Sequence, residues 1–141
     1  MTNPQRFFSL ILASWLLASF ALAEGKISAP DVQQRINNFD EIEQNFKALR
    51  FKLVNQKSTD ATGAKEMSQQ MLNLAYELPP LFSEVSSRQN FSFSRSKPEI
   101  WTRKALFKQQ LNEFIDDLEE IDELLDTQQL AAAAKVIDKA A

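Results

Sequence analysis

The sequence predicts an all-α protein, an antiparallel four-helix bundle over residues 24–141 that follows a signal peptide over residues 1–23. Apolar residues recur at spacings of three and four along four segments, which places them on one helical face in each segment. Short polar turns join the first two segments and the last two, and a longer connection that begins at a proline pair joins the middle two.

The first 23 residues have the pattern of a secretory signal peptide. Arg6 supplies the positive charge, residues 7–17 form an apolar core, and Ala21-Leu22-Ala23 is a small-residue cleavage site. An uncleaved membrane anchor is the alternative, but the apolar core is short for a membrane span. We therefore expect a mature chain that begins at Glu24 in the periplasm.

Composition limits both the partners and the chemistry. The chain has 141 residues with no cysteine and no histidine, and its formal net charge of −3 becomes −4 once residues 1–23 are removed. A mildly acidic chain gains nothing from the charge of nucleic acid or of anionic lipids, so we expect neither nucleic acid nor, after cleavage, a membrane as partner. Without cysteine the exported fold has no disulfide, and packing alone must hold it together.

The first two helices are expected over residues 30–56 and 60–78. Ser28 precedes the first, with Asp31 three residues later in a capping-box pattern, and Pro79 ends the second because proline has no amide donor. Their apolar faces consist of Val32, Ile36, Phe39, Ile42, Phe46, Leu49 and Leu53 in the first helix and of Met67, Met71, Leu74 and Leu78 in the second.

The last two helices are expected over residues 98–125 and 127–140, with Ser96 and Glu99 as a second capping-box pattern. The longer one has an apolar seam formed by Ile100, Phe107, Leu111, Phe114, Leu118, Ile121 and Leu125. We expect Phe114 to be central, so that its replacement by alanine would cost about 3–5 kcal/mol. The last helix is about half as long, which is expected to leave part of the core uncovered.

The connection over residues 81–96 is rich in serine but also contains Phe82, Phe91 and Phe93. Three solvated aromatic rings would forgo considerable burial energy, so we expect all three to pack against the bundle.

Two motifs carry a family resemblance. They are Leu78-Pro79-Pro80-Leu81-Phe82 and Lys97-Pro98-Glu99-Ile100-Trp101, and similarity continues through Phe107 and Asp126 into the alanine-rich residues 131–140. In this order the segments resemble the class II cytochromes c, the cytochrome c-prime family. The resemblance implies a last helix that continues into C-x-x-C-H, whose cysteines bind haem covalently and whose histidine ligates the iron. This sequence has neither residue type, and Ala141 stands near the place of the first cysteine.

The remaining donors do not replace that motif. Met67 and Met71 lie one turn apart and can in principle hold haem iron or Cu(I), but core packing is the favoured interpretation. Tyr76 is the sole phenol, and we expect it to be buried with a hydrogen-bonded hydroxyl. Trp101 is interpreted as a core residue or as a lid over a vacant haem cavity. An acidic run is interpreted as a solvated helix face: Asp116, Asp117, Glu119, Glu120, Asp122, Glu123 and Asp126.

No enzyme motif is present, so we expect no catalytic residues, no metal and no cofactor. Three possibilities stay open: a haem-free exported bundle with a binding or structural role, a periplasmic electron-transfer or gas-binding protein with non-covalent haem, and the product of a truncated gene. The partner is expected to be a small apolar ligand, a partner helix or a second copy. Its expected site is an apolar cleft near Phe39, Phe46, Met71, Trp101 and Ile137.

Overall fold

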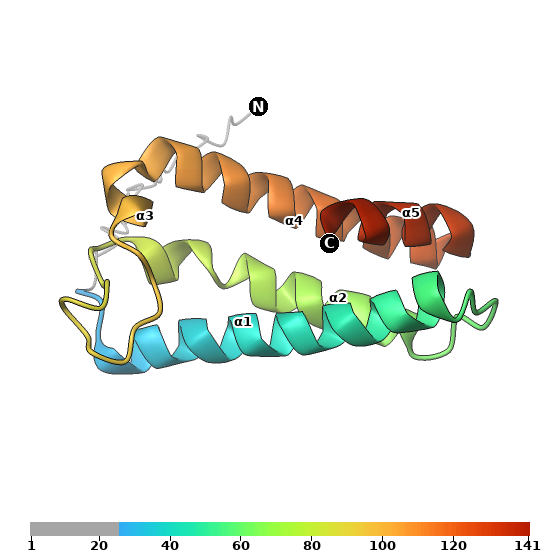
Figure 1. Ribbon diagram of the computed structural model, residues 1–141, viewed down its shortest axis with the longest axis horizontal. Helices are drawn as coiled ribbons and strands as arrows, with labels where there is room; N and C mark the ends of the chain where they lie inside the picture. Colours follow the sequence, from blue (N-terminus) through green and yellow to red (C-terminus); the bar gives the residue numbers. More distant parts are fainter. Residues whose placement is uncertain (1–25) are drawn as a thin grey trace, which may run out of the picture.

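The structure is a computed structural model that describes residues 26–141, so the predicted signal peptide lies outside the described residues. Within that range the chain is helical and contains no β-strand. Four helices form an antiparallel bundle in which each runs opposite to the one before it (Figure 1). They are α1 (Ala29–Arg50), α2 (Ala64–Tyr76), α4 (Lys104–Asp126) and α5 (Leu130–Ala140). The predicted fold class is confirmed.

Helix α1 begins where the sequence predicts. The Asp31 carboxylate accepts hydrogen bonds from the Ser28 hydroxyl and from the Ser28 backbone N–H, the latter at 2.7 Å. These bonds lower the pKa of Asp31 because they stabilise its ionised form. At its other end α1 passes into a π-helical turn (Phe51–Asn55), and Lys57 then adopts a left-handed φ of 51°.

The second helix starts later than predicted, at Ala64 rather than near residue 60. Residues 58–62 form a turn of their own, in which the Asp60 carboxylate accepts the backbone N–H of Thr62 at 2.8 Å. Gly63 follows with a φ of 74°, which favours glycine. This local hydrogen bonding competes with the first helical turn and delays the helix. After α2, Pro79 and Pro80 open a 3₁₀ turn (Pro79–Phe82).

The helix predicted over residues 98–125 is wrong as a single element. It is divided at Arg103 (φ −119°, ψ 44°) into α3 (Glu99–Thr102) and α4. The Trp101 indole N–H donates to the carbonyl of Phe82 at 3.1 Å, and Ile100 and Trp101 both pack against the core. A long-range contact thus directs α3 across the end of the bundle. The second capping box does not form, since the Ser96 N–H donates instead to the Ser94 hydroxyl at 3.3 Å.

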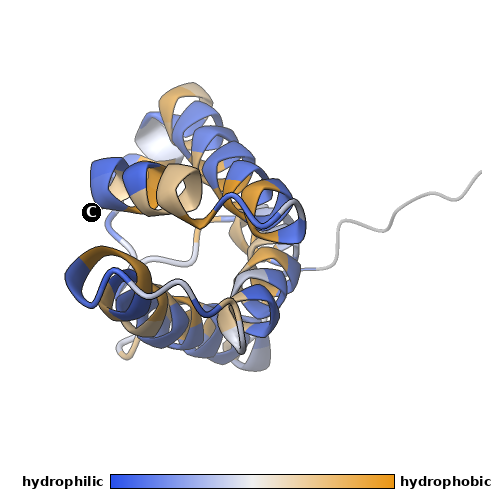
Figure 2. Cartoon of the chain, turned by 90° about the vertical axis from the view of Figure 1, so that its right-hand side faces the viewer, coloured by the Kyte–Doolittle hydropathy of each residue, from blue (hydrophilic) through white to orange (hydrophobic). Residues whose placement is uncertain are grey.

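The core is a single cluster to which all four long helices contribute. Figure 2 shows hydrophobic and hydrophilic residues alternating along each helix, as expected for amphipathic helices packed on a shared interior. The fully or nearly fully buried members include Leu49, Met71, Leu78, Leu118, Ile121 and Ile137. Among the described residues, no helix has the combined length and apolarity that crossing a membrane requires.

The connection after the 3₁₀ turn only partly follows the prediction. Phe82 is buried, Phe91 is half-buried, and Phe93 is 44% exposed, so Phe93 contradicts the expectation that all three rings pack on the bundle. Phe91 and Phe93 pack edge to face on each other instead. From residue 83 onward, the buried residues of this connection are three serines, Ser86, Ser87 and Ser94.

Candidate functional site

A groove lies between α1 and α4 because α5 covers only one end of the bundle. Helix α1 packs on α2, α2 on α4, and α4 on α5, so α1 and α4 occupy opposite corners. Helix α5 has 11 residues against 23 in α4, and it packs largely on α4 and the π-helical turn (Figure 1). The uncovered part holds two cavities of about 560 and 400 Å³. They adjoin, since Phe39, Asp40 and Arg95 line both.

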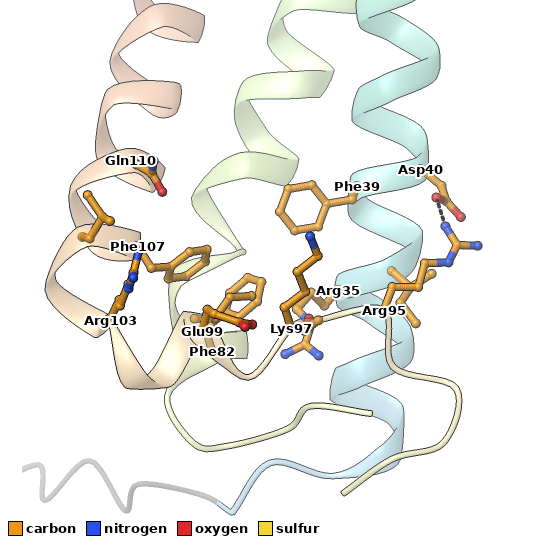
Figure 3. A pocket seen from close by; sticks show the side chains of 14 residues that line it. Arg35, Phe39, Asp40, Phe82, Arg95, Lys97, Glu99, Arg103, Phe107 and Gln110 are labelled. Carbon is orange, nitrogen blue, oxygen red and sulfur yellow. Dashed lines mark hydrogen bonds and ion pairs between the residues drawn. The ribbon is translucent and has the colours of Figure 1, made fainter. Parts of the chain in front are cut away.

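The larger cavity, called the basic cavity below, has an aromatic floor made of Phe39, Phe82 and Phe107. The Phe82 ring lies 4.7 Å from that of Phe107 and 6.3 Å from that of Phe39, measured between centroids. Figure 3 shows these rings gathered between α1 and α4, with Phe82 rising from the 3₁₀ turn. Edge-to-face and tilted packing of this kind fixes ring positions and presents a rigid apolar surface.

Arg35 forms one wall of the basic cavity and is only 2% exposed. Its guanidinium donates to the carbonyls of Leu81 and Ser86, both at 3.0 Å, and to the hydroxyls of Ser86 at 2.8 Å and Ser94 at 3.1 Å. It also lies 4.5 Å from the centre of the Phe82 ring. Burial lowers the pKa of Arg35, because desolvation penalises the charged form.

The partners of Arg35 are all neutral oxygens. Within residues 26–141 no carboxylate forms an ion pair with this guanidinium. An arginine stays protonated in proteins, so the wall of the cavity carries a buried positive charge without a counter-charge. The hydrogen bonds from Arg35 explain why Ser86 and Ser94 are buried in this loop.

Further charges lie at the mouth of the basic cavity. Arg95 donates to Asp40 of α1 at 2.8 Å, as drawn in Figure 3. Lys97 and Arg103 also line the cavity, and within the described part of the chain neither pairs with an acidic side chain. Four basic and two acidic side chains line this cavity in all, an excess of two positive charges.

The smaller cavity, called the apolar cavity below, continues the groove toward the end of α5. Its walls include Ile42, Phe46, Phe114, Leu118, Ile121 and Ala140. Its charged lining is Asp40, Glu43 and Asp117 with Arg95, so this end of the groove carries an excess of negative charge.

Of the five residues predicted for the cleft, Phe39 and Phe46 line the groove. The other three residues line neither cavity. Met71 and Ile137 are fully buried in the core, and Trp101 packs against the core with its ring centroid 6.3 Å from that of Phe82. Helical spacing alone cannot separate a core position from a groove position, because both lie on the apolar face.

Arg35 was not among the predicted site residues, although the sequence contains a signal for it. Residue 35 is three positions after Val32 and four before Phe39, so it falls within the apolar stripe of α1. A charged residue inside such a stripe predicts a buried, hydrogen-bonded side chain. Lys97 and Arg103 gave no comparable signal, since their position depends on the loop and on the break at Arg103.

The residues that line this groove do not include the usual ligands of haem iron. Thioether attachment requires cysteine and the usual axial ligand is histidine or cysteine, and the whole sequence has neither. Met71 is buried in the core, as favoured from the sequence, and Met67 packs beside it. Neither lines the basic or the apolar cavity. Tyr76 was expected to be buried but is 50% exposed, with its hydroxyl bonded to Glu119, which raises the pKa of Tyr76.

The acidic run of α4 lies mainly on the solvent side. Asp117 and Asp122 are half-buried and the other five residues of the run are exposed. Lys65 of α2 pairs with Asp122 at 2.7 Å and with Asp126 at 3.0 Å, which joins α2 to α4. Among residues 26–141 there is no group of three or more acidic, histidine or cysteine side chains placed to hold a metal ion.

Comparison with known proteins agrees with this architecture. The sequence pattern of the family described as Cytochrome C' matches residues 31–141, which is most of the chain and includes all four long helices apart from the first two residues of α1. Neither a curated protein nor a solved structure matches the chain. The match covers the connection that buries Arg35 and both helices that border the groove, so the chain belongs to the Cytochrome C' family.

Proposed function

We propose that this chain is an exported, haem-free member of the Cytochrome C' family that binds a small apolar molecule non-covalently. The observation that supports the proposal is the groove between α1 and α4, where α5 does not cover the apolar faces of the bundle. Ligand sites are typically concave and mostly apolar, with a few placed polar groups, and the groove has these properties. The proposed role is binding rather than catalysis, with no cofactor.

The family relationship implies haem c, and the sequence argues against it here. Residues 1–141 contain no thiol that could form a thioether bond to haem. Non-covalent haem would have to find an iron ligand in the groove, and both thioethers of α2 lie in or against the core instead. An apolar ligand without a metal needs no such donor.

Export to the periplasm is part of the proposal, and it is supported by the leader pattern of residues 1–23. When the full gene is expressed in a Gram-negative host, the protein released from the periplasm is expected to begin at Glu24. Intact-mass and N-terminal peptide measurements check this. A periplasmic product that retains residues 1–23, or a product confined to the cytoplasm, would contradict it.

The groove is tested with Nile red, an uncharged dye that fluoresces in apolar surroundings. We expect saturable binding at one site per chain. Gln110→Trp should weaken it at least about tenfold, because Gln110 is exposed and lines the basic cavity, where an indole would fill space that the dye needs. Gln109→Trp is the matched control: it makes the same exchange one residue away, outside both cavities, and should bind normally. Equal affinities for the two variants would place the dye elsewhere.

Haemin titration of the same protein distinguishes the alternative haem function. We expect no sharp Soret band that saturates at one haemin per chain, because among residues 26–141 no imidazole, thiolate or thioether lines the groove. A saturating band with submicromolar affinity, abolished by Gln110→Trp, would replace the proposed function by non-covalent haem binding.

A further inference from the structure

We infer that the groove selects a single-headed anionic amphiphile, namely a long-chain carboxylate. Its carboxylate lies in the basic cavity and its alkyl tail follows the groove into the apolar cavity. This inference rests on the proposed function and adds the chemical class of the ligand.

The head position follows from the charges of the basic cavity. The chain as a whole is acidic, with a net charge of −3, yet this cavity has two more basic than acidic side chains. Lys97 and Arg103 are exposed and form no ion pair within the described residues, so they are free to meet an incoming anion. Arg35, also in this lining, is buried and forms no ion pair with any residue of 26–141. A carboxylate at this point gains charge-assisted hydrogen bonds and partly neutralises the wall.

The tail position follows from the shape of the groove. On α4 the lining residues run from Leu106 to Ile121 on one helical face, a distance of about 23 Å at 1.5 Å per residue, and Arg103 lies just before the helix. On α1 they run from Arg35 to Phe46, about 17 Å. A narrow, extended apolar molecule therefore matches the groove better than a compact one. The half-buried rings of Phe46 and Phe114 contact its far part.

The orientation follows from the difference between the two cavities. The apolar cavity is bordered by Asp40, Glu43 and Asp117, with only Arg95 as a cation. These carboxylates would repel an anionic head at that end. They would equally repel a second negative charge at the far end of the alkyl tail. The groove therefore suits one negative charge followed by an uncharged chain.

The test compares three molecules with the same alkyl chain: dodecanoate, dodecanol and dodecyltrimethylammonium. Each displaces Nile red from the purified full-gene product below its micelle concentration. We expect dodecanoate to compete at least about tenfold better than dodecanol, and the cation to be the weakest, because only the carboxylate gains charge-assisted bonds. Equal competition by dodecanoate and dodecanol would overturn the inference and leave the proposed function intact, whereas absence of Nile red binding would remove the proposed function itself.

Charge-reversal variants locate the head. The double variant Lys97→Glu with Arg103→Glu should abolish the preference for dodecanoate over dodecanol, measured as the ratio of the two competitors' affinities within that variant. Its control is Arg88→Glu with Lys139→Glu, which makes the same change in net charge at exposed residues outside both cavities. A preference that persists in the first variant, or is lost equally in the control, contradicts the assigned head site. The inference would also be overturned if the protein is a dimer in solution and Gln110→Trp makes it a monomer, since a second copy of the chain would then occupy the groove.

Discussion

Leu118→Ala is expected to lower the free energy of unfolding by about 2–5 kcal/mol, measured by urea denaturation followed by circular dichroism. Leu118 is 1% exposed and packs in the core cluster formed by the long helices. Removing its side chain gives up the transfer energy of the buried carbons and leaves a cavity that rigid helices cannot close.

Phe114→Ala supplies the comparison for Leu118→Ala. The sequence pattern predicts that Phe114 is central, but the structure leaves it half-buried at the wall of the apolar cavity. Its replacement should therefore cost about 2 kcal/mol or less, because part of the ring already faces the groove. A loss from Phe114→Ala that equals or exceeds the loss from Leu118→Ala would show that the groove is closed at this point.

Arg35→Ala is expected to lower the free energy of unfolding by about 3 kcal/mol. The guanidinium makes four hydrogen bonds to residues of the connection and of the 3₁₀ turn, and truncation leaves the buried carbonyl of Leu81 without this donor. Arg35→Lys should recover little of this, since an ammonium group cannot reproduce the planar fork of donors. Urea denaturation measures the stability, and limited proteolysis within residues 83–97 reports release of the connection.

Arg95→Ala is the control for Arg35→Ala. Arg95 forms only a surface ion pair with Asp40, and its side chain is 72% exposed. Such pairs contribute about 0–1 kcal/mol because water and salt screen them. If both variants lose the same stability, the burial of Arg35 does not hold the connection in place.

The helices could be predicted from local pattern because each amphipathic helix repeats its apolar residues at the helical period. The start of α1 at Ser28 and Asp31 and the proline pair after α2 are local signals, and both were read correctly. The late start of α2 and the break at Arg103 were not predicted. The first depends on turn bonds around Asp60, and the second depends on Trp101 bonding to a residue 19 positions away.

The candidate site was predicted only in part. Phe39 and Phe46 were recognised as cleft residues, because a short last helix must leave some apolar surface uncovered. Met71 and Ile137 were assigned to the same cleft although they lie in the core. Their spacing is that of any apolar helical face, and only the positions of neighbouring helices decide which part of a face is covered.

The sequence by itself determined the helical period, the family pattern and the absence of cysteine and histidine from residues 1–141. These properties depend on residue type and on spacing along the chain. Only the tertiary structure decided that Arg35 is buried without a counter-charge and that Lys97 and Arg103 share a cavity with Phe39. Those properties depend on distances between segments far apart in the chain, which packing and the break at Arg103 set.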